Sequence, residues 1–160
     1  MSHLNRRGFL GTIPIVWAGM SSLSQAAFSA NDKVNVALVG CGGRGKGLGS
    51  WFAKLPDSQL VAVCDPDQSR SGQMADLVEK SGEKRPRLVE DFRTLLDGNE
   101  IDAIVIATPD HWHTPAAIMA CQAGKDVYVE KPCSHNIHEG RQLVNAARKY
   151  KRVVQHGTNL

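Results

Sequence analysis

The clearest chemical signal in this chain is a glycine-rich turn that follows an apolar run. Residues 34–39 are mostly apolar and lead into the pattern Gly-x-Gly-x-x-Gly at Gly40, Gly42 and Gly45. Between a strand and a helix, the first glycine permits a tight turn, the second lets the backbone approach a pyrophosphate, and the third lets the helix pack against the strand. The helix N-terminus then offers unpaired N–H groups to phosphates. The alternative is an ordinary glycine-rich turn without a ligand.

An aspartate at a fixed distance from the glycines favours dinucleotide binding. Asp65 stands twenty residues beyond the last glycine, at the end of a second apolar run, 60–64. Its carboxylate is expected to accept hydrogen bonds from the adenosine ribose hydroxyls and to repel the 2′-phosphate of NADP. Arg70 nearby softens this preference, so we expect NAD, with NADP less favoured. Gly43 and Arg44, inside the glycine pattern, also belong to the predicted cofactor site.

Length and composition bound the class of protein. The 160 residues suffice for one well-buried domain, and 42% hydrophobic with 22% charged residues is typical of a soluble globular protein. The net charge is +3 and falls to +1 without the first thirty residues, so we expect no nucleic-acid partner. The four cysteines show neither CxxC nor zinc-like spacing. We therefore expect thiols without a role and no metal site, and the spacing does not define a disulfide pairing.

The N-terminal segment has the features of an export signal. A twin-arginine pattern, Asn-Arg-Arg-Gly-Phe-Leu at 5–10, precedes an apolar stretch at 13–20, and small residues at 24 and 26 suit a signal peptidase. The apolar stretch is too short for a stable membrane anchor. We expect a signal peptide over 1–30 and a mature domain over 31–160, located in the periplasm or otherwise exported. An uncleaved, frayed N-terminal helix is the alternative.

Strand-like and helix-like segments alternate along the mature chain. The predicted strands cover about 33–39, 59–64, 87–89, 101–107, 126–129 and 152–155, and the predicted helices about 44–55, 68–80, 91–96, 114–124 and 137–150. Thr114 and Pro115 mark a helix start, with the hydroxyl as the cap. This alternation predicts an α/β fold, a Rossmann-type doubly wound parallel sheet in the order 3-2-1-4-5-6.

Ligands of such sheets bind at the carboxyl ends of the strands, so the segments that follow the fourth and fifth predicted strands are candidates for chemistry. They read Thr-Pro-Asp-His-Trp-His-Thr-Pro at 108–115 and Glu-Lys-Pro at 130–132. With Gly-Cys-Gly-Gly-Arg-Gly at 40–45, in this order and spacing, they resemble the glucose–fructose oxidoreductase/inositol dehydrogenase (Gfo/Idh/MocA) family. The resemblance covers about residues 33–159, and Glu-Lys-Pro is its most specific part.

The resemblance implies NAD(P)-linked oxidation or reduction of a sugar, polyol or related carbohydrate. Lys131 matches the lysine of the family's Glu-Lys-Pro motif. This match implies a catalytic position near the nicotinamide ribose and the reacting hydroxyl, where the positive charge favours a developing alkoxide. Glu130, also part of the predicted cofactor site, and Pro132 are implied to hold the shape of this loop.

The segment after the fourth predicted strand matches the family loop beside the nicotinamide half of the site. The predicted cofactor site therefore includes Thr108, Pro109, His111 and His113. The two histidines also suggest a metal pair, but no Cys, Asp or Glu cluster accompanies them, so packing or hydrogen bonding on the cofactor side is favoured. Asp110 lies in the same loop, and Trp112 fits either the core or a pocket wall. His156 ends the last predicted strand and is either structural or turned toward the site.

Family members continue beyond this segment into a second α/β domain, which supplies the substrate pocket, much of the oligomer contact and usually an acid/base histidine. This sequence ends at Leu160, so we expect a cofactor domain without its substrate half, truncated and inactive alone. The alternatives are a stand-alone dinucleotide-binding module and a fragment of an NAD-dependent glycosidase. The substrate stays open, as does the choice between a homo-oligomer and a complementing chain.

Overall fold

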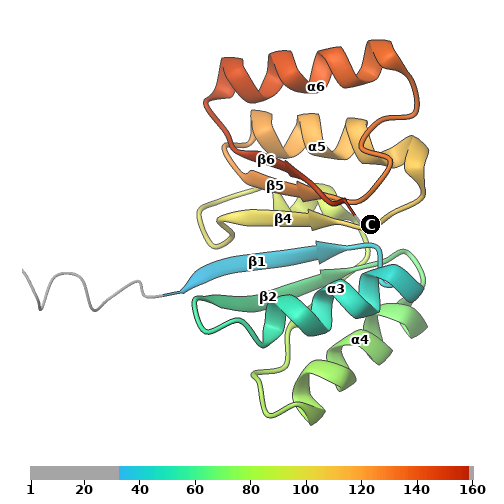
Figure 1. The fold of residues 1–160 in the computed structure, drawn as a ribbon. Coiled ribbons are helices and arrows are strands. Elements are labelled where there is room, and N and C mark those ends of the chain that lie inside the picture. The colour runs from blue at the N-terminus through green and yellow to red at the C-terminus, as the bar shows by residue number, and fades with distance from the viewer. Residues whose placement is uncertain (1–32, 159–160) are drawn as a thin grey trace, which may run out of the picture. The chain divides into compact units, whose positions relative to one another are not determined.

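Six parallel strands form one sheet, in the order β3-β2-β1-β4-β5-β6, in the computed structural model, which describes residues 33–158 (Figure 1). The strands are β1 (Val34–Val39), β2 (Ser58–Cys64), β3 (Arg87–Val89), β4 (Ala103–Ile106), β5 (Asp126–Val129) and β6 (Val154–His156). The α-helices are α3 (Gly43–Ala53), α4 (Gln68–Lys80), α5 (His113–Gln122) and α6 (Ile137–Tyr150), with short 3₁₀ helices η1 (Phe92–Leu95) and η2 (Asp110–Trp112). The predicted Rossmann-type sheet and its strand order are confirmed.

The predicted signal peptide, 1–30, lies outside the described residues. Within 33–158, no helix combines the length and the apolar character needed to cross a membrane.

Each face of the sheet carries its own hydrophobic core, because successive side chains of a strand point to opposite faces. Val36 and Leu38 of β1 pack with buried residues of α3 and α4. Ala37 and Val39 belong to the cluster that includes α5 and α6. Figure 1 shows the same division, with α3 and α4 on one side of the sheet and α5 and α6 on the other. Coverage of both faces explains why β1 and β4 are apolar over most of their length.

Most element boundaries follow the sequence pattern. The segments 68–80, 87–89, 126–129 and 137–150 match the prediction, and the other boundaries differ by one or two residues. The last strand begins at Val154 rather than at 152 because Lys151 ends α6 in the left-handed conformation, with φ of 53°. The backbone N–H of Arg152 then donates to the carbonyl oxygen of Ala147 (2.9 Å), which ties residue 152 to the helix end.

The predicted cap of α5 is wrong. α5 begins at His113, its N-cap residue is Trp112, and no side chain caps it. The hydroxyl of Thr114 donates instead to the carbonyl oxygen of Cys133 (3.0 Å), in the loop after β5. A contact with a neighbouring loop thus replaces the local cap that the sequence suggests.

The glycine turn and α3 approach each other so closely that only a hydrogen fits between them. A Cβ atom on Gly45 would lie 1.9 Å from the carbonyl oxygen of Gly40, far inside van der Waals contact. Gly47, two residues later in α3, has no atom within 4 Å of the corresponding Cβ position. The first turn of α3 is therefore fixed against the end of β1 by the absence of a side chain at Gly45.

We expect Gly45→Ala to lower the free energy of unfolding by about 3 kcal/mol or more, because the added methyl group must displace the Gly40 backbone. Gly47→Ala is the matched control in the same helix and should be neutral or stabilising by up to about 1 kcal/mol. Urea unfolding followed by circular dichroism measures both. Equal stabilities of the two variants would contradict the close approach.

Candidate functional site

The glycine turn begins with a residue in a conformation that favours glycine. Gly40 has φ of +92°, and a Cβ atom there would lie 2.6 Å from the carbonyl oxygen of Ala107. Its backbone N–H donates to the carbonyl oxygen of Cys64 (2.8 Å). Gly40 thus turns the chain in the narrow space between the ends of β2 and β4, which lie on either side of β1.

The next part of the turn is open and faces an uncapped helix end. Cβ atoms on Gly42 and Gly43 would meet no atom within 4 Å. Gly42 is the N-cap residue of α3, no side chain caps the helix, and its first turn holds no acidic residue. The first N–H groups of a helix lack partners within the helix and carry its positive dipole end. Open space beside such a helix end fits a pyrophosphate, as the sequence predicts.

Asp65 stabilises the turn through hydrogen bonds to backbone N–H groups, a role that the sequence does not reveal. Its side chain is buried, with 7% exposure. Oδ2 accepts a hydrogen bond from the backbone N–H of Cys41 (2.8 Å), and Oδ1 accepts one from the backbone N–H of Asp67 (2.9 Å). A carboxylate oxygen has two lone pairs, so each oxygen keeps acceptor capacity for the predicted ribose contact.

Two thiols lie next to this carboxylate. Burial, together with the charge of Asp65, raises the pKa of the Cys41 thiol to about 12, and the same causes raise the pKa of Cys64 to about 12. Both cysteines are free. Near neutral pH these thiols are protonated, which leaves them poor nucleophiles and poor metal ligands.

The loop after β4 places an unsatisfied polar atom near the same edge of the sheet. The hydroxyl oxygen of Thr108 is buried and has no hydrogen-bond partner among the described residues. The main contact of Asp110 is a hydrogen bond from the backbone N–H of His111 (2.8 Å), which lowers the pKa of the Asp110 carboxyl. The ring of His111 is largely exposed, and so is Pro109. Thr108 is therefore the residue of this loop with an unused, inward hydrogen-bonding group.

His113 differs from His111 in burial and in bonding. It is 2% exposed, with Nδ1 2.6 Å from the carbonyl oxygen of Pro132 and Nε2 2.8 Å from that of Thr108. Both ring nitrogens are thus occupied by backbone carbonyls. Residues 33–158 contain no group of three or more His, Cys, Asp or Glu that could hold a metal ion. His113 thus bonds to the protein backbone, and its predicted contact with the cofactor stays a prediction.

An ion pair links α3, the helix after the glycine turn, to the loop after β5. The side chain of Glu130 is 3% exposed, and its Oε1 accepts from Arg44 Nε (2.7 Å) and lies 2.6 Å from Arg44 Nη2. Its Oε2 accepts from the backbone N–H of Lys131 (3.0 Å). Burial alone would raise the pKa of Glu130, but these hydrogen bonds and the Arg44 charge more than offset it, so the pKa lies below the ordinary value. Arg44, Glu130 and Lys131 are thereby held together.

The exposed Lys131 completes the group at this edge. It follows the end of β5, and its peptide bond to Pro132 is cis. The predicted residues thus come from the turn after β1, the end of β2 and the loops after β4 and β5, which follow the carboxyl ends of adjacent parallel strands. Sequence reasoning missed Thr114, whose bond to Cys133 also joins two of these loops. Because Thr114 precedes a proline, the sequence suggests a helix cap and gives no sign of the bond to Cys133.

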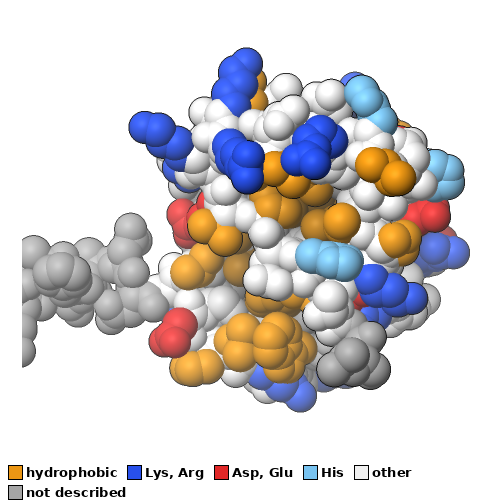
Figure 2. Space-filling view, turned by 45° about the horizontal axis from the view of Figure 1, so that its top comes forward, with side chains coloured by type: hydrophobic (Ala, Val, Ile, Leu, Met, Phe, Trp, Pro, Cys, Tyr) orange, Lys and Arg blue, Asp and Glu red, His pale blue; other side chains and the backbone are white. Residues whose placement is uncertain are grey.

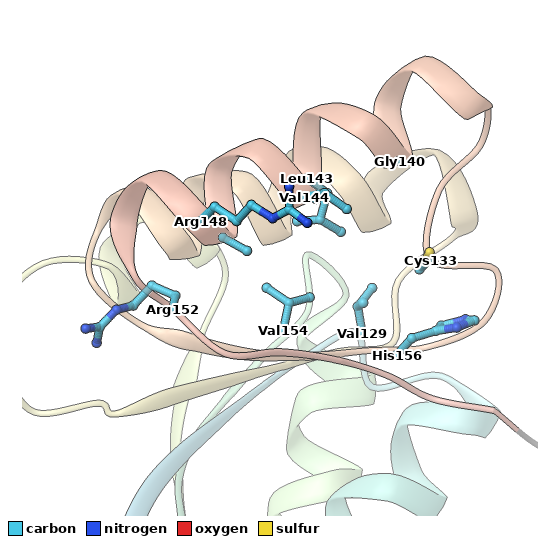
Figure 3. A pocket seen from close by; sticks show the side chains of 10 residues that line it. Val129, Cys133, Gly140, Leu143, Val144, Arg148, Arg152, Val154 and His156 are labelled. Carbon is cyan, nitrogen blue, oxygen red and sulfur yellow. The ribbon is translucent and has the colours of Figure 1, made fainter.

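His156 lies apart from the glycine turn. With Val129, Leu143 and Val154 it lines a cavity of about 380 Å³ between α6 and the sheet (Figure 3). Its Nε2 is buried and lacks a partner within residues 33–158. Figure 2 shows hydrophobic side chains exposed among Lys and Arg side chains on the face that carries α6. This cavity is separate from the predicted cofactor site.

The fold and the glycine turn are those of a dinucleotide-binding Rossmann domain. Residues 34–158 match the family described as GFO_IDH_MocA, an oxidoreductase family with an NAD-binding Rossmann fold. The chain belongs to this family, as the sequence resemblance indicates.

Three relatives illustrate the match. A protein of Saccharopolyspora erythraea named glycosyl hydrolase family 109 protein is 32% identical over an alignment of 149 residues, which covers 91% of this chain and 32% of the relative. The crystal structure of GenD2 from gentamicin A biosynthesis in complex with NAD has a TM-score of 0.70 at 30% identity, covering 79% of this chain and 34% of that one. The WlbA dehydrogenase from Chromobactrium violaceum, in complex with NADH and UDP-GlcNAcA, has a TM-score of 0.68 at 27% identity, covering 80% and 36%. This chain spans about a third of the length of these relatives.

The ion pair at Glu130 yields a prediction about acid stability. Because its pKa in the fold lies below the ordinary value of 4.5, the ionised pair stabilises the fold above that pH, and this contribution is lost as the pH falls through the lowered pKa. Glu130→Gln should therefore flatten the loss of stability between about pH 7 and pH 3 relative to the wild type. Urea unfolding at a series of pH values measures it.

Arg44→Met tests the same pair from the other side. It should cost about 2 kcal/mol at neutral pH, because a buried carboxylate loses its cation, and it should cost much less in a Glu130→Gln background. Arg85→Met, which breaks exposed contacts with Asp76 and Glu79, is the control and should cost at most about 1 kcal/mol. Additive effects of the Arg44 and Glu130 changes would show that the pair contributes nothing.

Proposed function

We propose that this chain is the cofactor half of an oxidoreductase that transfers a hydride between NAD and a hydroxyl-bearing carbon of a sugar, polyol or related carbohydrate. The observation that carries the proposal is the open, uncapped N-terminus of α3 at Gly42 and Gly43. It lies on the same edge of the sheet as the unsatisfied Thr108 hydroxyl and the Glu130–Lys131 loop.

Each part of the site has a proposed role. The backbone N–H groups of the first turn of α3 bind the pyrophosphate, and Asp65 accepts from the adenosine ribose. The segment Thr108–His113 borders the nicotinamide half, which when bound supplies the carbon that accepts or donates the hydride. The ammonium group of Lys131 stabilises the negative charge that develops on the substrate oxygen.

The preference for NAD over NADP follows from charge. A 2′-phosphate would meet the buried carboxylate of Asp65, which already accepts from two backbone N–H groups. Arg70, the nearby cation, has its Nε 3.3 Å from Asp67 Oδ2, so part of its charge is compensated within the chain. A 2′-phosphate of NADP beside Asp65 would therefore meet a cation whose charge is already partly compensated.

The substrate class is supported by the descriptions of the relatives, about two thirds of whose length lies outside the match with this chain. The WlbA structure contains UDP-GlcNAcA, and GenD2 takes part in gentamicin A biosynthesis. We propose that a second domain or a complementing chain provides the pocket and the acid/base group that accepts the alcohol proton. The exposed Ile137 and Val153 on and beside α6 offer apolar surface for such a contact or for a homo-oligomer. The coding sequence after codon 160 tests this, since an unrelated reading frame without an α/β domain would argue for a stand-alone module.

A glycosidase is the second candidate, favoured by the name of the relative from Saccharopolyspora erythraea. Both candidates use the same cofactor site. Release of sugar from aryl glycosides without net NADH, by the chain together with its substrate domain, would identify the glycosidase, whereas net NADH from a sugar or polyol would identify the dehydrogenase.

Export is proposed from residues 1–30 alone. The twin-arginine route carries folded proteins, which suits a domain that binds its cofactor before transport. We expect the wild type to be cleaved and periplasmic, and the double substitution Arg6→Lys, Arg7→Lys to remain uncleaved in the cytoplasm. Cell fractionation with immunoblotting measures both forms. Equal distribution of the two would refute the proposed route.

NAD binding can be measured directly on this chain. We expect the wild type to bind NAD in isothermal titration calorimetry, and Gly42→Leu to weaken binding at least about tenfold, because its side chain fills the open space over the helix end. Asp65→Ala should weaken it too, through the lost ribose contact and the lost support of Cys41.

Gly72→Leu is the matched control, since Gly72 lies in α4 with no atom within 4 Å of a Cβ position. It should leave NAD affinity unchanged. Unchanged affinity in Gly42→Leu and Asp65→Ala would show that NAD binds elsewhere, and absence of binding by the folded wild type would refute the proposed function.

A further inference from the structure

We propose that His113 is a positioning residue, which holds the loops after β4 and β5 at a fixed separation and thereby shapes the nicotinamide half of the site. The inference rests on the proposed NAD-binding function. It assigns to a buried histidine a task that is distinct from contact with substrate or with reacting atoms.

The ring of His113 spans the two loops. Its Nε2 meets the carbonyl oxygen of Thr108 at 2.8 Å, and its Nδ1 meets that of Pro132 at 2.6 Å. The two ring nitrogens point in different directions from one rigid plane, so the ring fixes the distance between the two carbonyls. Carbonyl oxygens only accept, so the ring donates to both when both nitrogens carry a proton and to one when a single nitrogen does.

A second side chain strengthens the same connection. The hydroxyl of Thr114 donates to the carbonyl oxygen of Cys133 at 3.0 Å. Consecutive residues at the start of α5 thus bind consecutive carbonyls of the loop after β5. His113 and Thr114 are 2% and 1% exposed, so water does not compete for these bonds.

These bonds determine where Lys131 lies. The residue before it, Glu130, is held by Arg44 of α3, and the residue after it, Pro132, is held by His113. Lys131 is thus fixed from both sides while its own side chain stays exposed. On the other loop, His113 binds the carbonyl of Thr108, whose hydroxyl is buried and unpartnered. One ring therefore orients the two groups that we place beside the nicotinamide ribose.

The adenosine half of the site does not depend on His113. The glycine turn after β1 and Asp65 at the end of β2 are held by bonds to Cys41, Cys64 and Asp67. Loss of His113 should therefore reduce the contribution of the nicotinamide half to binding and leave the adenosine half intact. ADP, which lacks both the nicotinamide and its ribose, is the probe that separates the two.

The experiment compares NAD with ADP by calorimetry on the full chain. We expect the wild type to bind NAD more tightly than ADP. His113→Asn, whose short amide cannot span the two carbonyls, should weaken NAD binding about fivefold and change ADP binding by less than about twofold. His138→Asn, at an exposed position of α6, is the control and should change neither affinity.

The outcomes separate this inference from the proposed function. Failure of the wild type to bind either ligand refutes the proposed function, and with it the basis for the inference. Binding of both ligands with an unchanged ratio of NAD to ADP affinity in His113→Asn overturns the inference alone. Equal wild-type affinities for the two ligands overturn it as well, because the two loops then contribute nothing to the nicotinamide half.

Thr114 provides the test if His113→Asn does not fold, as judged by circular dichroism. Thr114→Val removes the hydroxyl at nearly constant volume and should lower the ratio of NAD to ADP affinity. Thr114→Ser keeps the hydroxyl and should restore the ratio. Equal ratios in the valine and serine variants would overturn the inference, because the ratio would then not depend on the hydrogen bond to the Cys133 carbonyl.

Discussion

The steric constraint between Gly45 and Gly40 governs the site. The Gly40 carbonyl lies where a side chain on Gly45 would begin, so α3 starts directly at the end of β1. This position directs the first N–H groups of α3 toward the open space beside Gly42 and Gly43. It also brings Arg44 within reach of Glu130, eighty-six residues later in the chain. One missing methyl group thus sets both the phosphate-binding surface and its connection to the loop after β5.

The buried polar side chains at the carboxyl ends of the strands mainly connect separate segments of the backbone. Asp65 joins the turn after β1 to the chain after β2, Glu130 joins α3 to the loop that carries Lys131, and His113 joins the loops after β4 and β5. Because these groups are buried, each bond contributes more than it would in water, and each would be costly to leave unpaired. The exposed groups left for a ligand are mainly the first backbone N–H groups of α3 and the Lys131 ammonium group. Because the buried groups hold the backbone and the exposed groups remain for the ligand, the site is formed before the ligand binds.

Periodicity and glycine spacing predict the fold because both record local requirements. Apolar runs identify the strands, and the order of the sheet follows from their alternation with helices. The partners of individual side chains are not local. Thr114 precedes a proline and suggests a cap, yet its acceptor, Cys133, lies nineteen residues away. Asp65 and His113 are recognised as site residues from the sequence, but the carbonyls and N–H groups that they bind become apparent only when the strands lie side by side.

The outer strands of the sheet, β3 and β6, have three residues each. An edge strand offers unpaired backbone groups on which another chain can add a strand, and the length of that edge determines how strong such a template is. Here each margin presents only a few such groups. Growth of intermolecular cross-β structure is therefore poorly supported, and recognition between this domain and any companion is left to side chains on its helices.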